Sequence, residues 1–441
     1  MIHITWVNHA SFVASVDGVS LICDPWLDGM VFDNGWSLLS ETKFKYDDFA
    51  RITHVFFSHE HPDHFNPPNL RKIPESYRRK ITVLFHETRD KRVVKLCKSF
   101  GFQTQELPED TWVHLSDKVD VLCGRQGMID SWLAIRADGQ TILNMNDCVF
   151  DRDSELEHVA SLVGSPNVLF TQFSYANWVG NPQDYGSHRR YARAKLREIA
   201  RQVRALQPKV VVPCASFVWF SHVENYFANR EANRIWDVYD FITQQLGVKT
   251  VVLYPGDQWM VGDVGTDSTQ ALEKYRLDYT AVENSRVHLT KSPPVTLERL
   301  HEAHQSLRRK VIARNKLYLL RMIPSTIVFL TDLNVKFTIS LLRGIKVVTD
   351  DSSIADIALS SEALLYCFSY DWGGDTLAVN GRFIAPEGGN RLRFFRTFRV
   401  AAYNAAGFTL DLLVLFKIAK RFVERKLGLT GFKESPAASS S

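Results

Sequence analysis

The chain has 441 residues, of which 45% are hydrophobic and 23% charged, and its formal net charge is +4. This length is too great for one typical core, so two domains are expected. The composition is ordinary for a soluble globular protein. The charge excess is too slight to indicate a nucleic-acid partner.

The cysteines and the apolar runs bear on the cellular setting. Six cysteines are scattered through the sequence, and no two of them form a Cys-x-x-Cys pair. Since no signal peptide precedes them, we expect reduced, mostly buried thiols and a cytoplasmic location. No apolar run reaches the roughly 18 residues that a membrane span requires.

Short strands dominate the first part of the chain. Apolar patterns predict the strands, and Asp17-Gly18 and Asp138-Gly139 predict hairpin turns. The predicted strands are 2–7, 11–16, 19–23, 52–57, 81–86, 119–123, 130–136, 141–145, 166–171, 209–213 and 249–254, and the predicted helices are 89–99 and 187–206. Strands in runs that later alternate with helices favour two packed sheets with helices outside.

The composition shifts near residue 290, where Lys291-Ser292-Pro293-Pro294 is typical of a linker. Thr296 is a good N-cap for a helix whose apolar spacing continues to Ile323. Further predicted elements are strands at 334–341, 345–349 and 376–383 and helices at 361–369 and 409–427. We therefore expect domains at 1–290 and 295–430 and a disordered tail at 431–441.

The chemistry concentrates in Ser58-His59-Glu60-His61-Pro62-Asp63-His64, directly after an apolar strand. Two histidines two positions apart in an extended loop project to the same side, so His59 and His61 can bind one cation. Asp63 and His64 lie past the turn and point towards a second cation. Such ligands suit zinc, and also iron or manganese. A polar surface loop is the structural alternative, and it explains four such side chains poorly.

Another carboxylate follows a different strand. The segment from Ile142 to Cys148 is a predicted strand that ends near Asp147. A carboxylate at this place can bridge two metal ions or hold a water molecule. In isolation Asp147 would be interpreted as a turn cap, and the histidine motif is what favours a role at the metal.

These segments resemble the metallo-β-lactamase superfamily. The resemblance rests on the HxHxDH motif at 59–64, with Asn8-His9-Ala10-Ser11-Phe12 and Asp24-Pro25-Trp26 upstream. It implies an α/β protein, an αββα sandwich that here carries a smaller C-terminal α+β domain. It also implies that His9 and Asp24 support the ligands from behind, with Asp24 orienting a ligand histidine. A turn aspartate before Pro25 is the alternative.

Longer stretches at 24–27, 35–39, 57–64, 142–148, 213–217 and 221–222 resemble the metallo-β-lactamase-like part of CMP-N-acetylneuraminate hydroxylases, over roughly residues 3–235. Those enzymes also carry a Rieske iron–sulfur domain. This sequence has no Cys-x-His and Cys-x-x-His pattern to hold such a cluster. A hydroxylase role would therefore need a separate protein that delivers electrons.

Two positions depart from the superfamily pattern. Gln126 falls where the resemblance implies a third histidine for the first metal, and an amide oxygen binds zinc poorly. Near the strand that ends at Pro213, where the last ligand histidine is implied, Cys214 comes first and His222 follows. We take His222 as the ligand; Cys214 is the alternative, unless it is a buried structural thiol.

Two further features concern organic ligands. Tyr175, Asn177 and Trp178 follow a strand where the superfamily shapes its pocket, and they are candidates for substrate binding, with loop packing as the alternative. Residues 355–365 and 375–383 resemble a sterol-carrier-protein-like module, which offers an apolar tunnel. An accessory domain that dimerises or forms a lid is an equally good interpretation.

Three functions fit these residues, and we favour the first. In a metal-dependent hydrolase, an activated water attacks an ester, amide, lactone or phosphodiester bond, and Asp63 or Asp147 orients that water and accepts its proton. In an iron-dependent hydroxylase of a sugar or nucleotide sugar, a redox partner is needed. In a non-catalytic module, the metal clips the fold and the tunnel carries a lipid.

The expected cofactor is one or two zinc ions, with iron as the alternative. The expected ligands are His59, His61, Asp63, His64, Asp147 and His222. The expected partner is a small substrate, sugar-like or lipid-like. Homodimerisation and peripheral membrane contact through the basic amphipathic segment Leu410–Leu429 are further hypotheses.

Overall fold

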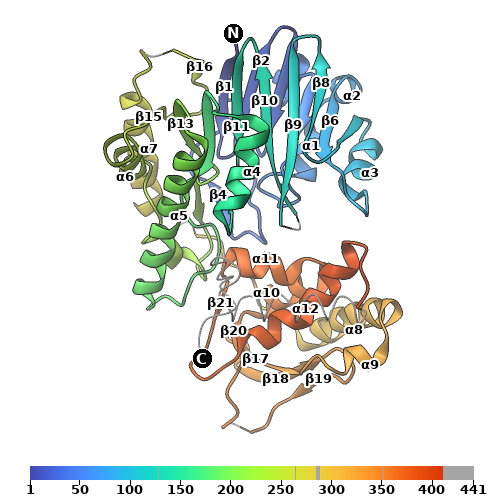
Figure 1. Ribbon diagram of the computed structural model, residues 1–441. Helices are drawn as coiled ribbons and strands as arrows, with labels where there is room; N and C mark the ends of the chain where they lie inside the picture. Colours follow the sequence, from blue (N-terminus) through green and yellow to red (C-terminus); the bar gives the residue numbers. More distant parts are fainter. Residues whose placement is uncertain (128, 264, 285–288, 351, 411–441) are drawn as a thin grey trace.

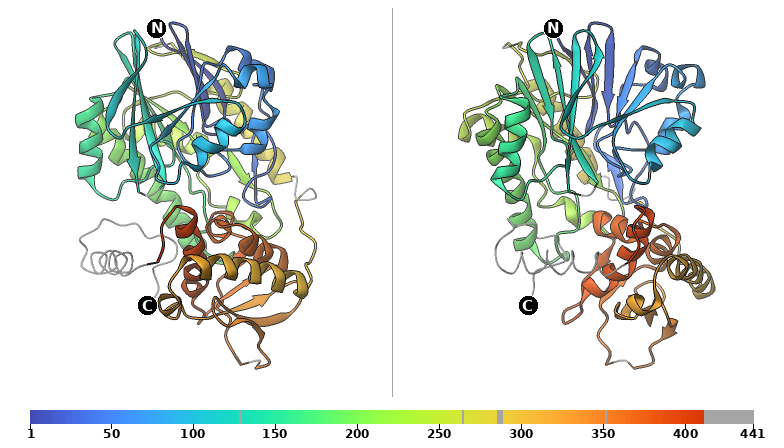
Figure 2. Two further views of the ribbon diagram at one scale, coloured as in Figure 1. Left: turned by 90° about the vertical axis from the view of Figure 1, so that its right-hand side faces the viewer. Right: turned by 45° about the vertical axis from the view of Figure 1, so that its right-hand side comes forward.

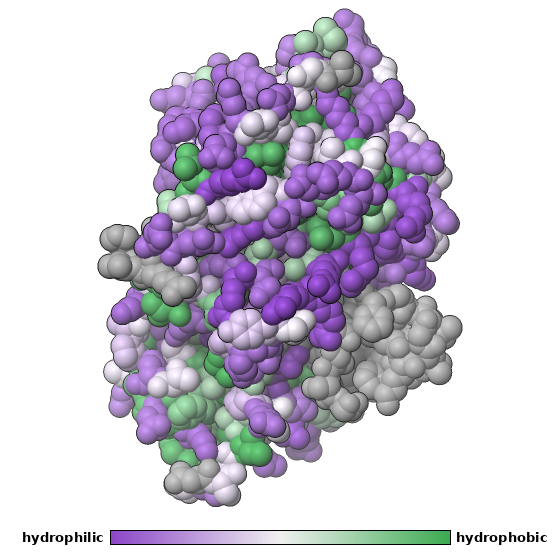
Figure 3. All heavy atoms as spheres, turned by 90° about the vertical axis from the view of Figure 1, so that its left-hand side faces the viewer, coloured by the Kyte–Doolittle hydropathy of each residue, from purple (hydrophilic) through white to green (hydrophobic). Residues whose placement is uncertain are grey.

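The computed structural model describes the chain except for residues 128, 264, 285–288, 351 and 411–441. None of the described helices is long and apolar enough to cross a membrane. On the face drawn in Figure 3, hydrophobic residues are scattered among hydrophilic ones. The predicted tail, the helix at 409–427 and nearly all of the proposed membrane-contact segment lie outside the described residues.

The first sheet has seven strands in the order β16-β1-β2-β3-β5-β6-β7. They are β1 (His3–Asn8), β2 (Ser11–Val16), β3 (Val19–Cys23), β5 (His54–Phe56), β6 (Thr82–His86), β7 (Gln103–Leu107) and β16 (Gln258–Met260). Asp17 and Gly18 join β2 to β3 with positive φ at both residues, as the predicted Asp-Gly hairpin requires. Strands β3 and β5 are parallel neighbours, so the loops that follow them begin side by side.

The second sheet also has seven strands, in the order β15-β13-β12-β11-β10-β9-β8. They are β8 (Thr111–Ser116), β9 (Val119–Gln126), β10 (Asp130–Ala137), β11 (Gln140–Asn144), β12 (Val168–Gln172), β13 (Val210–Cys214) and β15 (Lys249–Thr250). Strands β11, β12 and β13 run parallel. Their carboxyl ends therefore share one edge of the sheet.

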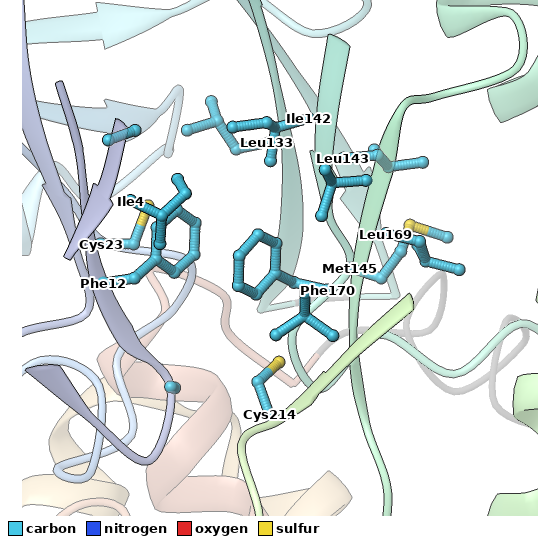
Figure 4. Packing of buried hydrophobic residues seen from close by; sticks show 14 of the residues in the cluster. Ile4, Phe12, Cys23, Leu133, Ile142, Leu143, Met145, Leu169, Phe170 and Cys214 are labelled. Carbon is cyan, nitrogen blue, oxygen red and sulfur yellow. The ribbon is translucent and has the colours of Figure 1, made fainter. Parts of the chain in front are cut away.

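The two sheets pack face to face and bury the main core between them. In Figure 4, side chains from both sheets point towards one another, and the rings of Phe12 and Phe170 stack with their centroids 4.2 Å apart. Helices cover the outer faces (Figure 1). They are α1 (Pro67–Lys72), α2 (Glu75–Arg78) and α3 (Arg92–Ser99) on one side and α4 (Asp153–Val163), α5 (Tyr185–Leu206), α6 (Ile235–Asp240) and α7 (Thr269–Asn284) on the other. The predicted αββα sandwich is confirmed.

Shorter elements complete the sandwich. A two-stranded ladder pairs β4 (Trp36–Leu38) with β14 (Val218–Phe220). Short 3₁₀ helices lie at Tyr46–Arg51 and Tyr226–Asn229, and a π-helical segment lies at Phe241–Gln245.

The C-terminal region is the expected smaller α+β unit, with a core of its own. Its sheet has the order β19-β18-β17-β20-β21, formed by β17 (Thr326–Leu330), β18 (Val335–Ser340), β19 (Gly344–Val347), β20 (Ile357–Leu359) and β21 (Phe383–Ile384). Its helices are α8 (Leu297–Arg314), α9 (Leu317–Leu320), α10 (Ser361–Ser369), α11 (Gly373–Asn380) and α12 (Arg391–Ala405). Figures 1 and 2 show α11 lying between this sheet and the sandwich.

The strand predicted at 376–383 is wrong, because these residues mostly belong to helix α11. Gly373 and Gly374 permit close packing at its start. A Cβ atom at Gly373 would lie 2.5 Å from Cys367 Cα, and one at Gly374 would lie 2.5 Å from Phe398 Cβ. A short apolar run cannot by itself distinguish a strand from a buried helix. The resemblance to a sterol-carrier-protein-like module stays a prediction.

The helix predicted from Thr296 to Ile323 begins as expected but ends early. The Thr296 side chain accepts a hydrogen bond from the Arg299 amide, which confirms the N-cap. The helix ends at Arg314 because Asn315 is extended and its side-chain Nδ2 donates to Val311 O and Asn404 Oδ1. Side-chain bonds of this kind compete with the helix. Strand β17 and helix α12 were not predicted.

Candidate metal centre

The loop after β5 is held by an aspartate from the end of the neighbouring strand. Asp24 follows β3 with a φ of +42°, which is uncommon for an aspartate. Its Oδ1 accepts from the Ser58 amide at 2.8 Å, and its Oδ2 accepts from Ser58 Oγ at 2.8 Å. This pairing fixes the start of the segment that carries the histidine motif.

His59 and His61 converge, as their spacing predicts. His59 Nε2 lies 2.9 Å from His61 Nδ1. Ligand atoms of these two rings and of Asp147 all lie within 4.8 Å of one another. This first group therefore places two imidazoles and one carboxylate around a shared point, as a single cation requires.

A second group lies beside the first and consists of His9, Asp63 and His64, all buried. Asp63 Oδ2 lies 3.3 Å from His9 Nε2 and 3.4 Å from His64 Nε2. His64 Nε2 also lies 3.6 Å from Asp147 Oδ2. Asp147 therefore contacts both groups and can bridge two cations.

Asp24 and His9 were both expected to support the ligand side chains, and the structure places them differently. Asp24 Oδ2 lies 3.0 Å from His64 Nδ1, which leaves His64 Nε2 facing Asp63 and Asp147. This is the geometry of a carboxylate that orients a ligand histidine. His9 Nε2 lies 3.3 Å from Asp63 Oδ2, so its ring can support that carboxylate, as expected, or act as a ligand within the second group.

The charge and hydrogen bonding of this centre fit a metal. Within the described part of the chain, His9 Nδ1, Asp63 Oδ1 and His64 Nε2 are buried and have no hydrogen-bond partner. Burial alone would lower the pKa of His64, but Asp63, Asp24 and Asp147 outweigh burial and raise that pKa well above its ordinary value. In the protein alone, a proton on His64 thus offsets part of the negative charge. A divalent cation could take over this role.

Asp130 was not among the predicted ligands. Its Oδ1 lies 4.0 Å from His59 Nε2, at the start of β10. Gln126, which stands where a third histidine was implied, instead donates from Nε2 to Val149 O at 2.6 Å and accepts from the Gly127 amide. Asp130 pairs with Gln126 across the β9–β10 hairpin, so it supplies a carboxylate directly beside the position where the histidine was implied. The signal was an acidic residue four positions after Gln126.

Gln172 was missed as well. It ends β12, and its Nε2 donates to Asp147 Oδ1 at 2.9 Å, while its Oε1 accepts from Lys195. Gln172 therefore holds the carboxylate that contacts both groups. A polar residue at the carboxyl end of a parallel strand was the available signal.

The structure does not place His222 with the other expected ligands. His222 Nε2 lies 3.3 Å from Ser292 Oγ, and Nδ1 lies 3.4 Å from Glu224 Oε2. Burial and the nearby Arg382 lower the pKa of His222 to about 3. Cys214 ends β13 outside both groups, and burial raises the pKa of its thiol well above the ordinary value. This arrangement favours the buried structural thiol.

A cavity of about 1060 Å³ opens beside the first group, and His61 forms part of its wall. Asn177 and Trp178, two of the three residues expected to bind substrate, also line it. Tyr175 does not, because its buried hydroxyl donates to Ala228 O at 2.6 Å. Tyr175 therefore packs the loop, which was the alternative interpretation.

Comparisons with known proteins agree with this fold. The family model described as beta-lactamase superfamily domain matches residues 3–215. A cytidine monophosphate-N-acetylneuraminic acid hydroxylase from Danio rerio is 24% identical over 241 residues, covering 50% of this chain and 39% of the relative. A putative Rieske 2Fe-2S iron-sulfur protein from Mycolicibacterium smegmatis is 27% identical, covering 40% of this chain and 35% of the relative. The matches thus span less than half of these relatives.

Two solved structures are similar to this chain over a little more than half of its length. CmlA, a diiron beta-hydroxylase from Streptomyces venezuelae, is 18% identical with a TM-score of 0.43, covering 58% of this chain and 54% of that one. Igni18, a metallo hydrolase from Ignicoccus hospitalis, is 19% identical with a TM-score of 0.42, covering 58% of this chain and 97% of that one. Residues 3–215 of this chain form a beta-lactamase superfamily domain with the metallo-β-lactamase fold, homologous to the corresponding part of the hydroxylases.

Proposed function

We propose that this protein is a hydrolase that works with two metal ions. One observation carries the proposal. Two groups of imidazole and carboxylate side chains lie next to each other, both contact Asp147, and one of them borders a large cavity. His59, His61 and Asp147 would hold one cation and His9, Asp63 and His64 a second, and such a pair would supply the Lewis acidity that hydrolysis requires.

The different solvent exposure of Asp147 and Asp63 suggests different roles for these two carboxylates. A bound divalent cation lowers the pKa of a coordinated water and polarises the substrate oxygen. The Asp147 side chain is 19% exposed, whereas that of Asp63 is 3% exposed. Asp147 is therefore the better placed of the two to accept the proton of the attacking water, while Asp63 fixes His9 and His64. Gln172 keeps Asp147 Oδ1 engaged, so Oδ2, which faces His64, is the oxygen that would either bind a cation or accept this proton.

The test separates metal content from bond cleavage. The protein is stripped with a chelator, reloaded with zinc, manganese or iron, and assayed with p-nitrophenyl esters, a lactone and bis(p-nitrophenyl) phosphate. We expect two metal ions per chain and cleavage of one substrate class, and Asp147→Asn should lower the rate by about 100-fold or more. The exposed Asp117→Asn is the matched control. A fully loaded protein that cleaves none of these bonds contradicts the proposal.

Hydroxylation is the second candidate, and Asp130 favours it. The first group holds two histidines and one carboxylate, the ligand set of non-haem iron oxygenases, and Asp130, whose Oδ1 lies 4.0 Å from His59 Nε2, offers a carboxylate in place of the missing third histidine. The similarity to cytidine monophosphate-N-acetylneuraminic acid hydroxylases points the same way. Consumption of oxygen by the iron-loaded protein in the presence of a reductant, together with no cleavage of the ester or phosphodiester substrates, would favour this function over hydrolysis.

A further inference from the structure

The cavity beside the metal centre has two different walls. The sandwich supplies the segment around His61 and the loop that carries Trp178, whereas the C-terminal region supplies α11, α12 and the turn before them. Its volume of about 1060 Å³ is comparable to that of pockets that bind drug-sized organic ligands. The sandwich and the C-terminal region enclose this space only together. Side chains of the C-terminal region therefore limit which ligands can approach His61.

Helix α12 presents charged and aromatic side chains in alternation along one wall of the cavity. Arg391, Phe395 and Arg399 all line it, and residues four apart lie on one face of a helix. At a rise of about 1.5 Å per residue, the two arginines stand roughly 12 Å apart with the phenyl ring between them. A ligand lying along this stripe would meet a cation, an apolar stretch and a second cation.

The two arginines differ in how their charge is balanced. Arg399 and His61 both interact electrostatically with Asp375 of α11, which also lines the cavity. The end of the cavity near His61 thus has its own carboxylate. Arg391 has no carboxylate within ion-pair distance among the described residues, and its guanidinium lies 4.7 Å from the centroid of the Trp178 ring. Burial lowers the pKa of Arg391, and Tyr191 and Asp184 do not offset this.

We infer that this cavity binds an amphipathic organic anion, whose anionic group pairs with Arg391 and whose apolar body lies along Trp178, Phe383 and Phe395. Arginine recognises carboxylate and phosphate groups through two parallel hydrogen bonds. The stacked rings of Trp178 and Phe383, with centroids 4.7 Å apart, give the body an apolar wall. The end of the ligand opposite its anionic group would then lie near His61. The inference rests on the proposed function only in taking that end as the part that reacts.

Binding is measured by calorimetry on the full-length, metal-free protein with four ligands: decanoate, decyl phosphate, 1-decanol and cytidine monophosphate. We expect decanoate or decyl phosphate to bind at least about tenfold more tightly than 1-decanol, since a charge-assisted bond to a half-buried arginine is strong. Comparing the two anions identifies the preferred head group. Arg391→Gln should remove the advantage of both anions and leave the affinity for 1-decanol unchanged.

Arg396→Gln is the matched control, because Arg396 is an exposed arginine of the same helix that does not line the cavity. Thermal unfolding checks each variant, and Arg391→Lys, which keeps the charge but loses the paired bonds, replaces Arg391→Gln if that variant does not fold. An unchanged anion affinity in these Arg391 variants, or tighter binding of cytidine monophosphate than of both decyl anions, overturns the inference. Because no metal is present, this outcome is independent of the test for hydrolysis.

Discussion

Two buried clusters of charge in this protein are neutralised in different ways. At the metal centre, carboxylates and imidazoles gather, and several of their ligand atoms have no partner among the described residues. Where the C-terminal region meets the sandwich, Arg382 is fully buried and lies 2.8 Å from Asp33, 2.7 Å from Glu224 and 2.7 Å from Glu362. The second cluster thus contains its own cation.

The way in which charge is balanced suggests a structural role for the Arg382 cluster and a functional role for the metal centre. A buried charge is tolerated only when it is paired. Arg382 pairs with carboxylates from both units of the molecule, so it fixes the C-terminal region against the sandwich and thereby shapes the cavity. The metal centre instead leaves buried donor atoms for a cation that the chain does not supply.

The largest effect is expected at Arg382. Arg382→Met removes the cation and leaves three carboxylates in one place, which should lower the free energy of unfolding by about 3–5 kcal/mol. Urea unfolding monitored by circular dichroism measures this loss. Arg396→Met, at an exposed site on α12, should stay within about 0.5 kcal/mol of the unsubstituted protein. A loss below about 1 kcal/mol for Arg382→Met would show that this cluster does not hold the units together.

Metal removal should have the next largest effect and act on the other cluster alone. A ligand present at 100 to 1,000 times its Kd stabilises a fold by about 2.7–4.1 kcal/mol, and chelation should remove that amount. Asp147→Asn should lose most of this response, whereas Arg382→Met should keep it. Unfolding curves with and without chelator give the comparison. An equal response in Asp147→Asn would break the link between this carboxylate and the metal.

Asp33 gives the Arg382 cluster a dependence on pH. Burial raises the pKa of Asp33 to about 8, and Arg382 counters this only in part. A carboxyl group whose pKa is raised on folding binds its proton more tightly in the folded state, so stability is greatest below the unfolded pKa and falls as the pH rises towards 8. We expect a fall of at most about 1.4 kcal/mol per pH unit. Asp33→Asn should flatten this slope, and an identical slope in both proteins would contradict the assignment.

The smallest effect is expected at Gln172. Gln172→Leu frees the Asp147 oxygen that Gln172 now engages, and loss of such an orienting bond should weaken metal binding by about tenfold. Competition with a chromogenic chelator measures the affinity. The exposed Gln183→Leu is the control. Unchanged affinity in Gln172→Leu would mean that the strand end alone positions Asp147.

Much of the metal centre follows from local sequence. The spacing of two positions predicted that His59 and His61 share one side, and in the folded chain the bond between Asp24 and Ser58 holds the start of their loop. Asp24 was expected to orient a ligand histidine, and it does contact His64. His222 shows the limit of such reasoning, because its distance from the motif along the chain says nothing about where its ring lies.

Residue patterns predicted two packed sheets, the Asp-Gly hairpins, the Thr296 N-cap and the convergence of the histidine motif, because these features depend on periodicity and on neighbours a few residues apart; the resemblance to the superfamily added the αββα arrangement. Long-range packing places Asp130 and Gln172 near the centre, sets the His9 ring beside Asp63, and brings Arg382 to Asp33 across 349 positions of chain. Contacts of this kind depend on how the sheets pack and on how the C-terminal region sits against them. No local pattern encodes those distances, so the cavity and the position of Arg391 in its wall follow only from the packing of the two units.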